Sequence, residues 1–136
     1  VRTGGRVVSV QRPAPTEPDD ITAVCDEMND ALQGDRVKPD TVLAHAEAAG
    51  LRLLDRTLTP RRTYGECPAE AIADIERRTY SALWDVDDAT WADVVEPALD
   101  RLRALPEPDR PRTRCARQEL FVFSPHDRSL TPGRRR

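Results

Sequence analysis

The stretch VRTGGRVVSV (residues 1–10) places a tight turn directly ahead of a short strand. The adjacent glycines Gly4 and Gly5 indicate the turn, because glycine adopts backbone conformations that other residues avoid. The run that follows, up to Val10, is rich in β-branched residues and favours a strand over a helix. Its apolar side chains fall on both faces, which is typical of a strand inside a sheet that helices cover on both sides.

The rest of the chain alternates between amphipathic helical patterns and two further apolar runs. Helices are predicted at residues 19–33, 40–49, 68–83 and 89–105, and strands at 51–59 and 118–123. Residues 61–66 are predicted to form a polar loop. Either Asp19 or Asp20 can cap the first helix, and Asp40 or Thr41 is expected to start the second.

The turn and strand at 1–10 resemble the turn and fifth strand of class I S-adenosylmethionine-dependent methyltransferases. In that family a Leu-x-Pro-Gly-Gly turn precedes the strand, and Thr3 stands here where the family usually has proline. The order that follows is also similar: a helix ending at Gly50, a strand, a helical insert and a closing strand. The resemblance covers nearly the whole chain, but only the back half of the family's domain.

This resemblance implies an α/β fold with a partial Rossmann-like methyltransferase sheet. The sheet would have three strands, with a helical insert before the last strand. That last strand, at 118–123, would be antiparallel and central, lying between 6–10 and 51–59. The resemblance further implies transfer of a methyl group to a small-molecule acceptor.

Length and composition fit one domain at residues 1–124, with the helical insert at about 67–105 and a disordered basic tail at 125–136. The net charge of −3 argues against nucleic-acid binding, and no apolar run is long enough for a membrane span. Three cysteines far apart, without a C-x-x-C pair, predict free thiols in a reducing compartment such as the cytoplasm.

No residue of this chain is assigned to the cofactor. The resembled family holds S-adenosylmethionine with a glycine-rich loop after its first strand and an acidic residue after its second, both upstream of the matching part. Gly4 and Gly5 precede a strand, whereas a nucleotide-binding glycine loop follows one and opens a helix. We therefore expect that this chain alone does not bind the cofactor and does not catalyse, and no catalytic base is named.

Candidate acceptor-binding residues come from two regions. The carboxyl ends of the two parallel strands carry arginines and a tyrosine that could orient an anionic or aromatic acceptor. The helical insert adds aromatic side chains large enough to line a pocket. The candidates are Arg12, Arg61, Tyr64, Tyr80 and Trp84. The alternatives are solvated loops for the first region and ordinary core aromatics for the second.

Two charged clusters have simpler explanations than a binding site. The acidic residues Asp85, Asp87 and Asp88 could suggest a metal site, but capping of the helix near Ala89 explains Asp87 or Asp88 directly. An arginine run could contact a phosphate backbone, yet no aromatic residues interleave it, so a solvated segment is the preferred interpretation. Its members are Arg110, Arg112, Arg114, Arg117 and residues 134–136.

Two other functions remain open at this stage. The chain could be a non-catalytic α/β binding or regulatory module that pairs with a partner chain through an open sheet edge. An RNA-associated protein that uses the arginine tail is the third hypothesis. If the sheet is open beside the strand from Val7 to Val10, self-association or a partner chain is expected there.

Overall fold

A computed structural model of the chain describes residues 4–13, 18–34 and 38–125. Its contacts divide the chain into two compact units, which we describe separately. The sheet unit comprises Val1–Pro13, Lys38–Pro60 and Arg117–Arg136, and the helical unit comprises Ala14–Val37 and Arg61–Ala116. The sequence analysis, which found one domain, had not anticipated this division.

Three strands form the sheet of the sheet unit: β1 (Val7–Gln11), β2 (Leu51–Leu58) and β5 (Glu119–Pro125). Their order is β1-β5-β2, and β5 is antiparallel to both neighbours. The strand order and direction predicted from the sequence are therefore confirmed. Because β1 and β2 both oppose β5, they run parallel to each other without bonding.

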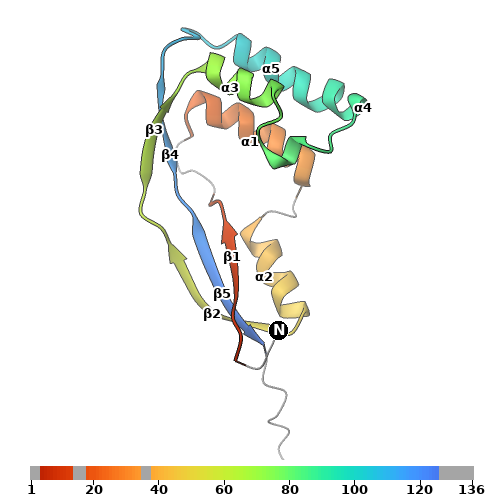
Figure 1. Ribbon diagram of the computed structural model, residues 1–136, viewed down its shortest axis with the longest axis vertical. Coiled ribbons are helices and arrows are strands. Elements are labelled where there is room, and N and C mark those ends of the chain that lie inside the picture. Colours follow the sequence, from red (N-terminus) through yellow and green to blue (C-terminus); the bar gives the residue numbers. More distant parts are fainter. Residues whose placement is uncertain (1–3, 14–17, 35–37, 126–136) are drawn as a thin grey trace, which may run out of the picture. The chain divides into compact units, whose positions relative to one another are not determined.

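One face of this sheet is covered by α2 (Pro39–Ala48), as Figure 1 shows. Phe121 and Phe123 of β5 are buried there against Ala46, with Val42 and Leu43 of α2 packed around them. The expected start of this helix at Asp40 or Thr41 is wrong by one or two residues, because the helix begins at Pro39. Pro39 occupies the first turn, where its missing N–H leaves no helical hydrogen bond unmade.

The helical unit begins with α1 (Asp20–Gln33). The carboxylate of Asp19 accepts a hydrogen bond from the Thr22 backbone N–H at 2.9 Å, so Asp19 is the N-cap that the sequence left open between two residues. At the other end Gly34 has a φ of 59°, a left-handed conformation that ends the helix at little cost for glycine.

The next helix, α3 (Pro68–Glu76), is shorter than predicted. It was expected to continue to residue 83, but Arg78 adopts a φ of 53° and breaks it. The Arg78 side chain donates to the carbonyl oxygens of Leu83 and Val86 at 2.7 and 2.9 Å, and its guanidinium stacks on the Trp91 ring. These contacts order the connection, which includes the 3₁₀ turn η2 (Ser81–Leu83).

The last helical stretch is interrupted, as Pro97 predicted. It consists of α4 (Asp88–Thr90), the π-helical turn η3 (Trp91–Val95) and α5 (Glu96–Arg103). Asp87 caps α4 by accepting from the Thr90 backbone N–H at 2.7 Å, which confirms the capping role expected in this acidic cluster. Helices α1, α3 and α5 lie side by side in Figure 1 around one aliphatic core. That core contains Ile21, Val24, Met28, Ala71, Ile75, Leu83, Val95, Ala98, Leu99 and Leu102.

Two strands of the helical unit were not predicted. β3 (Arg62–Glu66) and β4 (Arg112–Ala116) form an antiparallel two-stranded sheet. The expectation of a polar loop at 61–66 is therefore wrong, because partners about 50 residues along the chain supply backbone hydrogen bonds that local sequence does not reveal. At the chain end, Pro125 closes β5 instead of starting the expected tail, and residues 126–136 lie outside the described part.

We expect the aliphatic core of the helical unit to dominate the stability of that unit. Leu102 is fully buried, so Leu102→Ala should lower the free energy of unfolding by about 2–5 kcal/mol through lost burial and a residual cavity. Leu58→Ala serves as the control, because Leu58 is 45% exposed on β2. Urea unfolding followed by circular dichroism measures both; equal losses would contradict the assignment of this core.

Candidate functional site

A buried ionic cluster lies where the two-stranded sheet meets the start of α1. Residues i and i+2 of a strand share a face, so Tyr64 and Glu66 of β3 lie on the same face as Arg112 and Arg114 of β4. In the observed register Tyr64 is opposite Arg114, and Glu66 is opposite Arg112. Both arginines and Glu66 are buried, although charged side chains rarely are unless they are paired.

Arg114 is the centre of this cluster and is only 6% exposed. Its guanidinium forms an ion pair with the Glu66 carboxylate through Nη1. Its Nη2 and Nε atoms donate to the Thr22 hydroxyl oxygen at 2.8 and 3.2 Å, and Asp19 Oδ2 lies 3.6 Å from Nε. The guanidinium carbon is 5.7 Å from the centre of the Tyr64 ring, within cation–π range.

Asp19 and Arg114 stabilise each other in the ionised state. Burial opposes charging of Asp19, but hydrogen bonds from Thr22 and the charge of Arg114 outweigh it and lower the Asp19 pKa. Burial likewise opposes the charge of Arg114, and the ion pair with Glu66 outweighs it and raises the Arg114 pKa. With its donors directed at Thr22 and Glu66, Arg114 acts as an internal brace.

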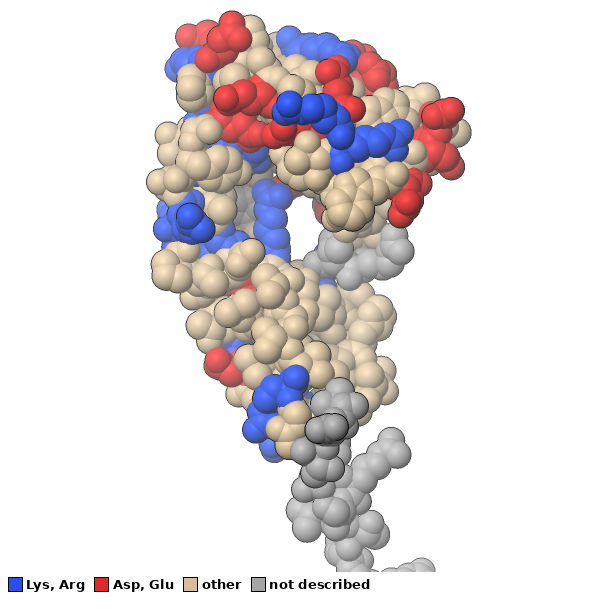
Figure 2. Space-filling view, in the orientation of Figure 1, with Lys and Arg blue, Asp and Glu red and all other residues tan. Residues whose placement is uncertain are grey.

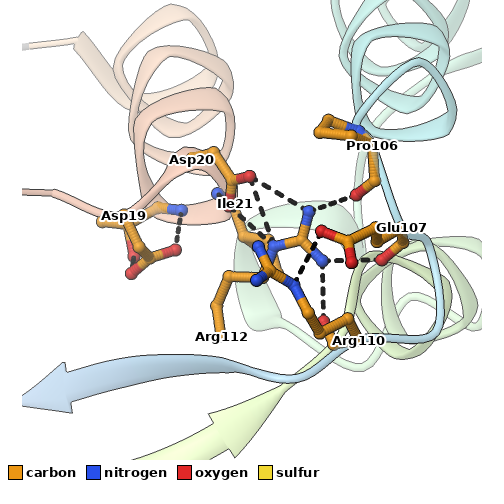
Figure 3. Close-up of polar contacts among 8 residues, drawn as sticks. Asp19, Asp20, Ile21, Pro106, Glu107, Arg110 and Arg112 are labelled. Atoms are coloured by element: carbon orange, nitrogen blue, oxygen red, sulfur yellow. Dashed lines mark hydrogen bonds and ion pairs between the residues drawn. The ribbon is translucent and has the colours of Figure 1, made fainter.

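Arg112 makes a second brace, drawn in Figure 3. Its guanidinium pairs with the Asp20 carboxylate, with an Nη2–Oδ2 distance of 3.2 Å. It also donates to the backbone carbonyl oxygens of Glu107 and Arg110 at 2.7 and 2.6 Å, and to that of Pro106. One side chain thereby ties the loop after α5 to the first turn of α1.

A shallow hollow of about 560 Å³ adjoins the cluster within the helical unit. Its lining includes Tyr64, Glu66, Cys67, Asp74 and Arg77. These side chains offer one aromatic face, several carboxylate oxygens and a thiol. Since Arg114 contacts both Glu66 and Tyr64, the same guanidinium orients two of these lining groups.

Tyr80 lies close enough to the cluster to respond to its charges. Burial and the negative charges of Glu66 and Asp74 raise the pKa of Tyr80 to about 12. The phenol therefore keeps its proton well above neutral pH. In this site it can donate a hydrogen bond, but it does not ionise readily enough to serve as a general base at pH 7.

The structure brings two of the five candidate residues from the sequence to one place. Tyr64 contacts Arg114 of the ionic cluster, and Tyr80 lies within reach of the charges of Glu66 and Arg114. Both are exposed, which excludes the interpretation of Tyr80 as a core aromatic. Trp84 is 65% exposed, and its indole N–H donates to the Arg78 carbonyl oxygen at 3.0 Å, away from the core. Arg61 is exposed just before β3, and Arg12 is exposed just after β1 in the sheet unit.

The expectation of a solvated arginine run is wrong for its two central members. Arg112 and Arg114 are buried and engaged with carboxylates, so neither is available to contact a phosphate backbone. On the face of the helical unit seen in Figure 2, basic and acidic side chains are intermixed over its upper part. The hypothesis of RNA contact through this part of the run has no structural support.

The residues that build the cluster were missed by the sequence analysis. Arg114 was placed in a basic run, Glu66 in a loop, and Thr22 was not considered. The signal that could have found them is alternation: Arg62, Tyr64 and Glu66 recur at every second position, as do the buried arginines of β4. That period of two is typical of strands, although short polar strands seldom show it clearly.

Comparisons with known proteins give no relative for this chain. No protein-family model matches the chain, and no curated protein matches it either. Within residues 4–13, 18–34 and 38–125, no helix is long and apolar enough to cross a membrane. The same residues contain no group of three or more His, Cys, Asp or Glu side chains placed to hold a metal ion.

Loss of the Arg114 charge should be costly because it leaves Glu66 buried without its partner and removes the cation beside the half-buried Asp19. We expect Arg114→Met to lower the free energy of unfolding by about 3–5 kcal/mol, and Glu66→Leu added to it to restore part of the loss. Arg103→Met is the matched control, since Arg103 also has carboxylate partners but on the exposed surface. Urea unfolding distinguishes them; similar losses at both arginines would show that burial of the cluster has no energetic role.

The raised pKa of Tyr80 gives a testable pH dependence. Because the folded-state pKa is about 12 and the ordinary value is 10.0, the folded protein binds the phenolic proton more tightly than the unfolded chain. The stabilisation is complete below pH 10 and is lost as pH rises to about 12. Absorbance at the phenolate band, compared between the wild type and Tyr80→Phe, should show this late titration; a difference curve centred near pH 10 would contradict it.

Proposed function

We propose that this chain is the C-terminal portion of a class I S-adenosylmethionine-dependent methyltransferase that acts on a small molecule. The observation that supports the proposal best is the strand order β1-β5-β2 with an antiparallel central β5. The family resemblance predicted this order from the sequence. Consecutive strands usually pair with each other, so a last strand that returns between two parallel strands is an uncommon arrangement to match.

The helical unit would set the choice of acceptor in this proposal. Between β2 and β5 the chain builds β3, α3 to α5 and β4, at the point where the resembled family carries an insert over the acceptor pocket. Tyr64 and Tyr80 would contact the acceptor through ring faces and hydroxyl groups. Arg114 would act as a positioning residue by holding Tyr64 and Glu66 in place.

Arg12, Arg61 and Trp84 are retained in the proposal with smaller roles. Arg12 follows the end of β1, and Arg61 precedes the start of β3. At either position an anionic group of an acceptor could pair with the guanidinium. The exposed ring of Trp84 offers a stacking surface. Methyl transfer depends chiefly on alignment of the acceptor, so contacts of this kind are what the reaction requires of the protein.

The described residues do not fit the cofactor itself. Gly4 and Gly50 have positive φ values, but each precedes a strand, and neither opens a helix whose N-terminus could face the cofactor. S-Adenosylmethionine is the methyl donor of the resembled family. Its binding is therefore assigned to polypeptide beyond this chain, and the role left to these residues is to hold the acceptor.

Calorimetry with S-adenosylmethionine tests this function on two proteins. Residues 1–136 should give no measurable binding heat, whereas the product of the reading frame extended upstream of Val1 should bind at micromolar concentration. Tyr80→Phe is the matched variant, and it should leave the cofactor heat of the extended protein unchanged while weakening binding of a small-molecule acceptor. Micromolar binding by residues 1–136, or no binding by the extended protein, would show that the proposal is wrong.

A further inference from the structure

The hollow beside the ionic cluster has an acidic lining. Four residues around its space of about 560 Å³ carry a carboxylate: Glu66, Glu70, Asp74 and Asp109. Among the described residues that line it, Arg77 is the single basic one, and its guanidinium already pairs with Asp74 at 2.8 Å. The lining therefore repels an anionic group and attracts a positive one.

Glu66 offers this hollow a carboxylate oxygen that has no partner. The residue is only 8% exposed, and its Oε2 atom pairs with Arg114. Within the described part of the chain no hydrogen bond reaches its Oε1 atom. No fully buried side-chain oxygen of the described residues lacks a partner, so Oε1 must be open to solvent, and Glu66 lines the hollow. A carboxylate fixed in this way is a strong acceptor for a charged donor.

The rest of the lining adds aromatic and small side chains. Tyr64 is 45% exposed and presents its ring beside the hollow. Gly65, Ala69 and Ala73 have side chains too short to fill the space. The face of an aromatic ring attracts a cation, as carboxylate oxygens do, so Tyr64 and the acidic groups favour the same class of ligand.

The helical unit as a whole carries charge of the same sign as the lining. Its residues, Ala14–Val37 and Arg61–Ala116, include 19 acidic side chains and 10 arginines, a net charge of −9. The remaining residues carry a net charge of +6, since the total for the chain is −3. A hollow within a unit of one sign concentrates ligands of the opposite sign before any contact forms.

We propose that the hollow binds a small organic cation, in which a protonated amine is joined to an apolar or aromatic part. The amine donates to Oε1 of Glu66 and to the neighbouring carboxylates, and the apolar part lies against the Tyr64 ring. A metal ion fits less well, because the described residues contain no group of three or more His, Cys, Asp or Glu side chains placed to hold one. A space of about 560 Å³ also suits an organic molecule better than a lone ion.

This inference deepens the proposed function by naming the class of acceptor, and it rests on that function only in taking the hollow as the acceptor site. The protonated amine is the group by which the ligand is held. Binding of a cation in the hollow requires neither S-adenosylmethionine nor any residue outside the helical unit, so it can be measured on this chain alone.

Three probes that share one ring and differ in charge test the inference on residues 1–136. They are benzylammonium, benzyl alcohol and benzoate, each added at constant ionic strength while NMR follows the backbone amides of Gly65, Ala69 and Ala73. Benzylammonium should shift these signals with a dissociation constant of roughly 1 mM or below. Benzyl alcohol should bind at least roughly tenfold more weakly, because it lacks the charge-assisted hydrogen bonds, and benzoate should not bind. Equal binding of all three, or binding of none, would overturn the inference.

Paired variants locate the cation. Glu66→Gln is unsuitable alone, because it also breaks the ion pair with Arg114. Asp109→Asn and Tyr64→Leu change exposed lining groups, and each should weaken benzylammonium binding severalfold. Asp93→Asn is the matched control, since Asp93 is an exposed acid of the same unit that does not line the hollow. If Asp93→Asn weakens binding as much as Asp109→Asn, the cation follows the general charge of the unit, and the inference is wrong.

Calorimetry with S-adenosylmethionine on the extended protein separates this inference from the proposed function. Selective benzylammonium binding by residues 1–136, together with no cofactor binding by the extended protein, refutes only the methyltransferase proposal. Cofactor binding by the extended protein, together with no preference for benzylammonium over benzyl alcohol, refutes only the inference.

Discussion

The sheet unit depends on β5, because this strand alone joins β1 to β2 among the described strands. β1 and β2 lie far apart in the sequence and make no backbone hydrogen bonds to each other. Both strands pair with β5, which lies at the end of the described chain. Phe121 and Phe123 of β5 also supply the aromatic part of the core under α2. Backbone pairing and side-chain packing in this unit therefore converge on one segment.

The helical unit depends on a different constraint, the burial of arginine. A guanidinium inside a protein must be paired, since an isolated buried charge is far more costly than a buried ion pair. Arg114 meets this requirement with Glu66, Thr22 and Asp19, and Arg112 meets it with Asp20 and backbone carbonyl oxygens. These partners come from the start of α1, from β3 and from the loop after α5, so satisfying two side chains specifies how three separate segments meet.

The two constraints bear on function in different ways. The central antiparallel β5 is the feature on which the methyltransferase proposal depends, and it belongs to the scaffold. Arg114 contacts Glu66 and Tyr64, two groups that line the hollow and that a ligand there would meet. A brace of this kind favours a site with fixed geometry, because moving either lining group would separate a buried ion pair or a cation–π contact.

The sequence by itself determined the elements whose signals are local. Helix starts and ends follow from Asp19, Gly34 and Pro68, whose effects act within one turn. The sequence also predicted β1 from its β-branched composition, and it predicted the central position of β5 from the family resemblance. Tertiary structure decided the rest: β3 and β4 require backbone partners about 50 residues apart, and Arg112 and Arg114 change from an expected solvated run into buried braces. Pairing across such distances depends on which segments the folded chain brings together, and no local pattern of residues records that.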